Sequence, residues 1–312
     1  MSSNVNGLKV PPSLLERYRG CLLGLACGDA VGTAVEFERR GSFPLVTDMS
    51  GGGPFDLKPG QWTDDTSMAL CLAESLIKME GLNARDQMDR YVRWWRNGYL
   101  SATGKCFDIG MTTETALRRF EETGDPIAGD TDQCSAGNGS LMRLAPVVLF
   151  FYPAVEDVLR YSAESSRTTH AAHEAIECCM VLGDRICGAL SGDSKEDILH
   201  RKVAAVVQPK VKALTKPAFL RKTQDAIVGS GYSVSSLEAA LWCFARTDSF
   251  EQAILDAVNL GDDADTTAAI TGQIAGAYYG IQGIPSHWLE RLHMRTFIDE
   301  LARGLYAAVI DR

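Results

Sequence analysis

Two clusters of acidic residues, each beside a threonine and each directly before an apolar, helix-like run, are the groups of this sequence that could do chemistry. They lie far apart in the chain, in GQWTDDTSMAL and in LGDDADTTAAITGQIAGAYYG. The first cluster consists of Thr63, Asp64 and Asp65, and the second of Asp262, Asp263, Asp265 and Thr266. Because the helix dipole favours acids in a first turn, each cluster alone is either a helix N-terminus, with Thr63 as the cap of the first, or part of a cation site.

The repetition of this layout favours a cation site. If the two helices are neighbours, five acids converge, and a cation must offset their mutual repulsion. All candidate ligand atoms are oxygens, with no histidine or cysteine nearby, which favours Mg²⁺, Mn²⁺ or Ca²⁺ over zinc. The carboxylates are sufficient for two ions, an arrangement that activates a water or orients substrate hydroxyls in hydrolysis.

Two loops elsewhere in the chain could contact a ligand. SAGNGSLMR, from Ser135 to Arg143, is a small, glycine-rich loop that runs into an apolar segment. Such a loop is either an ordinary turn or a cradle of backbone N–H groups for a phosphate. In CFDIGMTTETAL, Asp108 and Gly110 stand just before another helix, as a cap or as a ligand contact.

Four single residues complete the set of candidates. Asp29 and Glu36 of GDAVGTAVEF lie across a helix end and the loop after it. His170 of TTHAAHEA stands at a helix start, where a lone histidine is usually structural. Tyr232 of GYSVSSLEAALW could stack on a base, although a buried aromatic is the default reading.

Helical signals dominate the elements that must position these residues. Ser13 and Glu16 form a capping box before the first helix, along which Gly20, Gly24 and Gly28 recur every four residues. In a soluble protein this repeat predicts that another helix packs closely against a smooth face. The apolar pattern after the first acidic cluster predicts a helix that ends near residue 81.

Further helices are expected along the rest of the chain. They cover residues 86–95, 113–122, 154–162, 171–190, 195–207, 235–244, 250–259, 265–279 and 297–310. PVVLFF, residues 146–151, is the only stretch that favours a strand, and it is short. With no internal repeat and no long linker, the sequence predicts one compact all-α domain whose loops carry the chemistry.

Composition excludes several classes of protein. The chain has 312 residues, 46% hydrophobic and 23% charged, with a formal net charge of −9 and no basic cluster. Non-specific nucleic-acid binding is therefore not expected, because it needs concentrated Lys and Arg. We expect no signal peptide and no membrane span. Nine cysteines without a Cys-x-x-Cys pair predict buried thiols in a reducing compartment, so we expect a cytoplasmic protein.

Taken in order, these segments resemble the ADP-ribosylglycohydrolase family, in particular the bacterial dinitrogenase-reductase-activating glycohydrolases. The resemblance runs from about Leu14 to the C-terminus and rests on GDAVGTAVEF, WTDDTSMAL, FDIG, SAGNGSLMR, TTHAAHEA, GYSVSSLEAALW and LGDDADTTAAITGQIAGAYYG. It implies a single-domain orthogonal helical bundle over residues 1–312, with residues 1–12 as a flexible N-terminal tail. Ala136 departs from several relatives, which carry a larger side chain there, so contacts to adenine can differ.

The resemblance also implies roles for individual residues around a cleft with two divalent cations, Mg²⁺ or Mn²⁺. The metal ligands would be Thr63, Asp64, Asp65, Asp263, Asp265 and Thr266, with Asp262 beside them. The candidates for the general base would be Glu36, Asp64, Asp65 and Asp108. The substrate contacts would be Asp29, Gly110, Ser135, Gly137, Asn138, Gly139, His170 and Tyr232, with the diphosphate held by residues 135–139 and by His170.

The implied function is hydrolysis that removes ADP-ribose from an ADP-ribosylated protein, with arginine as the expected linkage and free ADP-ribose as the product. Serine-linked ADP-ribose is an alternative, because relatives for both linkages share most of the motifs. Another alternative is a protein of the same fold with little turnover, which binds ADP-ribose or neutralises a toxin as an immunity protein.

Overall fold

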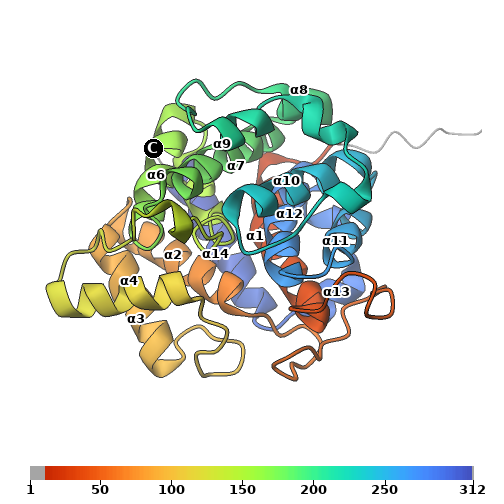
Figure 1. Ribbon diagram of the computed structural model, residues 1–312. Coiled ribbons are helices and arrows are strands. Elements are labelled where there is room, and N and C mark those ends of the chain that lie inside the picture. Colours follow the sequence, from red (N-terminus) through yellow and green to blue (C-terminus); the bar gives the residue numbers. More distant parts are fainter. Residues whose placement is uncertain (1–10, 311–312) are drawn as a thin grey trace, which may run out of the picture.

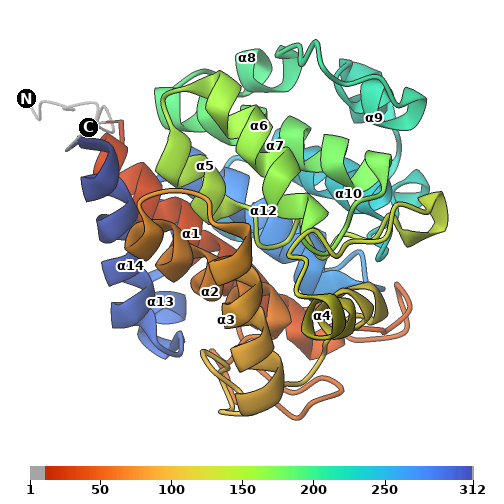
Figure 2. The same cartoon turned by 90° about the vertical axis from the view of Figure 1, so that its left-hand side faces the viewer.

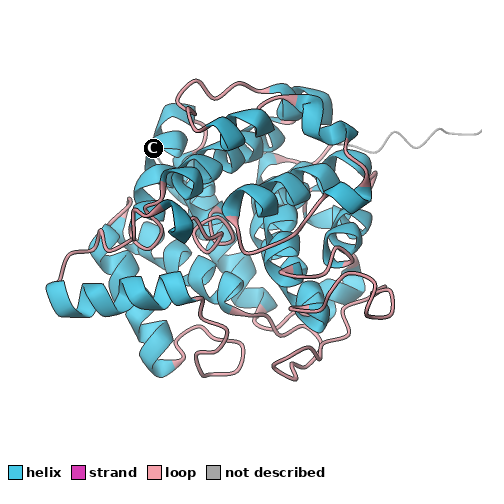
Figure 3. Cartoon of the chain, in the orientation of Figure 1, coloured by secondary structure: helices cyan, strands magenta, loops and turns pink. Residues whose placement is uncertain are grey.

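The structure is a computed structural model that describes residues 11–310, so most of the expected N-terminal tail lies outside the described residues. Within that range the chain is helical, with isolated β-bridges and no longer strands (Figure 3). The α-helices are α1 (Leu14–Gly32), α2 (Asp64–Met79), α3 (Ala84–Asn97), α4 (Met111–Thr123), α5 (Ala145–Phe151), α6 (Val155–Arg167), α7 (His173–Ser191), α8 (Lys195–His200), α9 (Pro209–Leu214), α10 (Ser233–Arg246), α11 (Phe250–Val258), α12 (Ala264–Tyr279), α13 (Ser286–Arg291) and α14 (Arg295–Ile310). The predicted all-α, single-domain fold is confirmed.

Helices α1 and α12, near opposite ends of the chain, lie side by side in the middle of the molecule (Figures 1 and 2). The glycine repeat of α1 faces α12. A Cβ atom added to Gly24 would lie 2.4 Å from the carbonyl oxygen of Gly272, and one added to Gly20 would lie 2.2 Å from that of Gly276. Only glycines permit this separation, so the close helix packing predicted from Gly20, Gly24 and Gly28 is confirmed.

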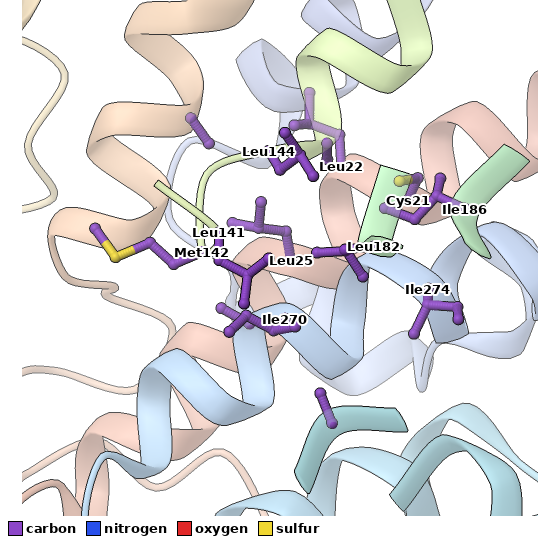
Figure 4. Packing of buried hydrophobic residues seen from close by; sticks show 14 of the residues in the cluster. Cys21, Leu22, Leu25, Leu141, Met142, Leu144, Leu182, Ile186, Ile270 and Ile274 are labelled. Atoms are coloured by element: carbon purple, nitrogen blue, oxygen red, sulfur yellow. The ribbon is translucent and has the colours of Figure 1, made fainter. Parts of the chain in front are cut away.

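The apolar core surrounds this central pair. Figure 4 shows residues of α1, of α7, of α12 and of the segment before α5 packed together. Those labelled are Cys21, Leu22, Leu25, Leu141, Met142, Leu144, Leu182, Ile186, Ile270 and Ile274. Because these residues are almost completely buried, the core fixes the directions of α1, α7 and α12, and the N-terminus of α12 carries the second acidic cluster.

The stretch that favoured a strand, residues 146–151, is helical instead and belongs to α5. Every residue of α5 is buried, and the helix packs against α1, α2, α6, α7 and α14. A short apolar run that is buried on all sides carries no helical periodicity, which is why its sequence pattern could not distinguish helix from strand.

The helix predicted over residues 195–207 ends early, at His200. Two contacts redirect the chain after this point. The Arg201 side chain donates hydrogen bonds to Asp184 and Asp193, each at 3.1 Å. The Glu177 carboxylate accepts the backbone N–H groups of residues 207 and 208, at 3.1 and 2.8 Å. These tertiary bonds replace the helical ones that the local sequence would otherwise favour.

The other local predictions concern caps, thiols and membrane spans. Ser13 and Glu16 form the predicted capping box at α1. All nine cysteines lie within the described residues and are free, with Cys134 exposed and Cys106 half-buried. No helix of residues 11–310 is sufficiently long and apolar to span a bilayer. The cytoplasmic location stays a prediction.

Candidate functional site

A pocket of about 460 Å³ opens between the start of α2, the start of α12 and the loops around α4 and α5. Ten of the residues singled out from the sequence line it: Glu36, Asp64, Asp108, Gly110, Gly137, Asn138, Gly139, His170, Asp263 and Thr266. The remaining seven, Asp29, Thr63, Asp65, Ser135, Tyr232, Asp262 and Asp265, do not line it. The pocket has the size of a typical small-molecule site.

The two acidic clusters meet at the floor of this region, where the N-termini of α2 and α12 lie together. The Thr63 hydroxyl oxygen lies 3.1 Å from a carboxylate oxygen of Asp65 and 3.2 Å from one of Asp265. The Thr266 hydroxyl lies 3.4 Å from the same oxygen of Asp65. Oxygens of Glu36, Asp108 and Asp265 also gather within 4.8 Å of one another.

Of the five acids expected to converge, Asp262 does not join the others. Asp262 is exposed and does not line the pocket. Its backbone instead pairs with the loop after α1, because its N–H donates to the Glu38 carbonyl at 2.8 Å and its carbonyl accepts from Phe37 at 2.7 Å. Asp262 and Phe37 both adopt positive φ, 55° and 63°. This pairing fastens the segment that carries Glu36 beside the start of α12.

Asp29 caps helix α2 from a different helix. One of its carboxylate oxygens accepts the Thr63 N–H at 2.8 Å, and the other accepts the Thr66 N–H at 3.0 Å and the Thr66 hydroxyl at 2.6 Å. Thr63 occupies the N-cap position of α2, but its side chain makes no capping hydrogen bond. Thr63 thus has the expected N-cap position, but the expectation that its side chain caps the helix is wrong, since Asp29 accepts the N–H of Thr66 in the first turn.

Burial and mutual repulsion raise the pKa values of the clustered carboxyls. Burial is the main cause for Asp64, Asp65 and Asp265, whose pKa values lie well above the usual range, and neighbouring carboxylates add to it. Burial also raises the pKa of Asp108 to about 7, and that of Asp29 to about 6 against the opposing hydrogen bonds from threonines. Ionising all these carboxyls is therefore energetically unfavourable unless a positive charge lies beside them.

Glu36 is a strongly perturbed acid that lines the pocket. The residue is only 3% exposed, and burial followed by repulsion from Asp265 and Asp108 raises the pKa of its carboxyl strongly. One of its oxygens, Oε2, and the Oδ1 oxygen of Asp65 are buried without a hydrogen-bond partner among the described residues. Buried polar atoms are rarely left in this state, so both oxygens fit a role as ligands of a cation.

A second wall of the pocket is glycine-rich and carries no carboxylate. Asn138 fixes this wall to the acidic one, because its side-chain amide donates to Asp263 at 2.6 Å and to Ser236 at 3.1 Å. Gly137 and Gly139 leave room for the imidazole of His170: a Cβ on Gly139 would lie 2.7 Å from its Cε1 atom. The wall therefore offers small residues and a histidine to a ligand.

Tyr232 and Ser135 lie beside this wall, with their side chains bonded to protein groups. The Tyr232 hydroxyl donates to the Glu174 carboxylate and accepts from Lys210 at 3.0 Å. The Ser135 hydroxyl donates to Asp130 at 3.2 Å. Their expected ligand contacts stay predictions.

Several residues that line the pocket were missed by sequence reasoning. They are Phe37, Ile109, Met111, Thr112, Thr113, Met142 and Gly231. Most adjoin a residue that was chosen, such as Glu36 or Gly110, so proximity to a motif residue was the available signal. Phe37 and Met111 remain 66% and 83% exposed and flank the opening of the pocket.

Comparison with known proteins agrees with this fold. The model of the family described as ADP-ribosylglycohydrolase matches residues 10–312. The ADP-ribosylarginine hydrolase Tri1 of Pseudomonas putida (strain GB-1) is 43% identical over 296 residues, which cover 95% of this chain and 79% of that protein. The ADP-ribosyl-[dinitrogen reductase] glycohydrolase of Rhodospirillum rubrum is 33% identical over 289 residues, 91% of this chain and 93% of that protein.

A solved structure gives the same result. The structure titled "ADP-ribosylglycohydrolase-related protein complex" superposes with a TM-score of 0.84 and 45% identity, and the match covers 95% of this chain and 99% of that one. The chain belongs to the ADP-ribosylglycohydrolase family, which confirms the resemblance found in the sequence. It is accordingly an enzyme of the glycohydrolase class.

Proposed function

We propose that this enzyme removes ADP-ribose from ADP-ribosylated arginine side chains of proteins, with two divalent cations, Mg²⁺ or Mn²⁺, in its site. The observation that carries the proposal is the lining of the pocket, in which a wall of carboxyls adjoins a glycine-rich wall. ADP-ribose has a matching division between ribose hydroxyls and a diphosphate. The name of the P. putida relative, an ADP-ribosylarginine hydrolase, supports arginine as the linkage.

The residues present fit a pair of hard cations. The proposed ligands are the oxygens of Thr63, Asp64, Asp65, Asp263, Asp265 and Thr266. The Thr63 hydroxyl lies within 3.2 Å of carboxylate oxygens from Asp29, Asp65 and Asp265, but its single proton can serve only one of them. The surplus lone pairs and the all-oxygen donor set suit Mg²⁺ or Mn²⁺. When bound, such ions neutralise the carboxylates and polarise coordinated oxygens.

One of the chain's carboxylates would act as the general base that takes a proton from the attacking water. The others would stabilise the positive charge that develops on the ribose. Cleavage of the glycosidic bond passes through an oxocarbenium-like transition state, which nearby anions stabilise. Of the four candidates for the general base, Glu36, Asp64 and Asp108 line the pocket, whereas Asp65 lies behind it.

The glycine-rich wall holds the rest of the substrate. Backbone N–H groups of residues 135–139 would face the diphosphate, with His170 beside them, as in other glycine-rich anion loops. The arginine side chain and its protein leave through the opening flanked by Phe37 and Met111. ADP-ribose is the product.

The test uses arginine-ADP-ribosylated and serine-ADP-ribosylated proteins, each with Mg²⁺, Mn²⁺ or EDTA. We expect release of ADP-ribose from the arginine-linked substrate with metal and none with EDTA. Faster release from the serine-linked substrate would replace the proposed linkage. ADP-ribose binding without release from either substrate would indicate a binding or immunity protein. Release that persists in EDTA and in Asp64→Ala or Asp265→Ala would contradict the metal requirement.

A further inference from the structure

Arg143 is a completely buried cation behind the glycine-rich wall. It forms no ion pair with any carboxylate of residues 11–310; its Nη2 group donates to the Thr169 hydroxyl at 2.7 Å, and its Nη1 group approaches the sulfur of Met68 at 3.6 Å. The guanidinium also lies 4.6 Å from the centre of the Tyr91 ring. Its Nε atom has no hydrogen-bond partner among the described residues. A buried charge without a counterion is costly, so it calls for a reason.

Thr169 connects Arg143 to His170. Its hydroxyl oxygen lies 2.8 Å from Nδ1 of His170, and the residue is completely buried. A guanidinium only donates hydrogen bonds, so the Thr169 oxygen must accept from Arg143. The hydroxyl proton then has one acceptor among the described residues, which is Nδ1 of His170. If Nδ1 carried a proton instead, the buried Thr169 proton would be left without a partner.

This arrangement fixes the protonation of His170. With Nδ1 accepting, the imidazole is neutral and carries its proton on Nε2. Burial, followed by the charge of Arg143, lowers the pKa of His170 to about 3, in agreement with a neutral ring. The Nε2 edge lines the pocket beside the glycine loop: a Cβ on Gly137 would lie 3.3 Å from Nε2, and one on Gly139 would lie 3.0 Å from it.

We propose that Arg143 and Thr169 are positioning residues that hold His170 as a neutral Nε2–H donor, and so adapt this wall of the pocket to the diphosphate of the ligand. Arg143 supplies positive electrostatic potential from behind the wall. Thr169 accepts a hydrogen bond from Arg143 and donates one to Nδ1 of His170, which links the two residues. The negative charge of the ligand would offset the positive charge of the Arg143 guanidinium, which has no counterion among the described residues. The identity of the anion as the diphosphate of ADP-ribose rests on the proposed function; the protonation of His170 does not.

The first test measures the tautomer of His170 in the ligand-free protein. Long-range ¹H–¹⁵N spectra of ¹⁵N-histidine-labelled protein distinguish protonated from unprotonated ring nitrogens, and the His170→Gln variant identifies the signal. We expect a neutral ring with its proton on Nε2 in the wild type. In Thr169→Val we expect a mixture of tautomers. A proton on Nδ1 in the wild type, or an unchanged tautomer in Thr169→Val, would overturn the proposal.

The second test measures what this tautomer contributes to binding. We expect Thr169→Val to weaken binding of ADP-ribose about tenfold and to raise KM with little change in kcat. Without the Thr169 hydroxyl, His170 is no longer held as an Nε2–H donor, so its hydrogen bond to the diphosphate is weakened. Thr169→Ser, which keeps the hydroxyl, should restore both values. Arg143→Met should weaken binding in the same way, and if it fails to fold, Thr169→Val still decides.

The matched control is Thr168→Val. Thr168 is as buried as Thr169, but its hydroxyl donates to the Ser165 carbonyl at 2.8 Å and does not bond to His170. Equal losses of ADP-ribose binding in Thr168→Val and Thr169→Val would mark a merely structural effect and overturn the proposal. Failure of the wild type to bind ADP-ribose would instead contradict the proposed function and the assignment of the diphosphate, while the spectra still decide the role of Thr169.

Discussion

The carboxylate of Asp29 accepts the backbone N–H of Thr63 at 2.8 Å, across an interface between two helices. Together with its bonds to Thr66, this contact makes Asp29 the cap of α2. The acidic cluster at the start of α2 is thus held in place by another acid that is itself completely buried. The position of Asp64 and Asp65 depends on α1 as much as on α2.

Replacing Asp29 should therefore destabilise the protein. We expect Asp29→Ala to lower the free energy of unfolding by about 3 kcal/mol, because it leaves the buried N–H groups of Thr63 and Thr66 and the Thr66 hydroxyl without an acceptor. The control is Ser249→Ala, which removes the cap of α11 at an exposed site and should cost about 1 kcal/mol. Urea denaturation of both variants gives the comparison. Equal losses would show that Asp29 acts as an ordinary cap.

His170 should make the protein sensitive to acid. The pKa is lowered to about 3 in the folded state from a usual value of 6.5, so below pH 6.5 only the unfolded chain gains the proton. The stability due to the neutral ring is complete above pH 6.5 and is lost as the pH falls towards 3. At pH 5 the loss is about 2 kcal/mol, or about 1.4 kcal/mol for each unit below 6.5.

The measurement compares free energies of unfolding at pH 7.5 and pH 5 for the wild type, for His170→Gln and for His200→Gln. We expect the difference between the two pH values to shrink by about 2 kcal/mol in His170→Gln only. His200 is exposed and serves as the control. The same pH dependence in the wild type and His170→Gln would contradict a neutral, buried His170.

The acidic cluster should destabilise the protein when no metal is bound and stabilise it when metal is bound. Asp65→Asn removes one buried anion that faces Asp265, so in EDTA we expect this variant to unfold at a higher temperature than the wild type. Added Mg²⁺ or Mn²⁺ at one hundred times its Kd should stabilise the wild type by about 2.7 kcal/mol and the variant far less. Calorimetry with and without metal tests both statements. Equal stabilisation by metal would remove Asp65 from the proposed ligands.

The contact between α1 and α12 should tolerate no side chain at Gly24. Gly24→Ala places a methyl group 2.4 Å from the Gly272 carbonyl oxygen, inside any normal contact distance, and we expect a loss of about 3 kcal/mol. Gly81→Ala is the control, since nothing lies within 4 Å of the added carbon. Thermal unfolding should separate the two variants. A Gly24→Ala protein as stable as Gly81→Ala would contradict the closeness of the two helices.

Local sequence patterns predicted much of this molecule. The glycine repeat of α1 predicted a closely packed helix, although not that α12 supplies the partner glycines. The similar layout of the two acidic clusters predicted a shared cation site on the condition that their helices are neighbours, and the structure places the starts of α2 and α12 together. Periodicity located the amphipathic helices, but it failed for α5, which is buried on every side and has no polar face to set a period.

What the sequence could not predict depends on contacts between distant residues. Asp29 caps α2 across 34 positions of the chain, and no local signal marks a cap in another helix. Asp262 resembles its acidic neighbours in sequence but is exposed, because its backbone pairs with residues 37 and 38. Likewise, Arg143 and Thr169 carry no motif of their own, and their link to His170 appears only once the chain has folded.

The pairing of α1 with α12 also determines when the site can exist during synthesis. The ribosome completes residues 14–32 early and residues 264–279 only near the end. Until then the glycine-lined face of the first helix has no partner, and Asp64 and Asp65 lack the acids that complete their cluster. A growing chain that lacks α12 therefore cannot form a site that binds a ligand. The capacity to bind a ligand arises in one late step, after nearly the whole protein has been made.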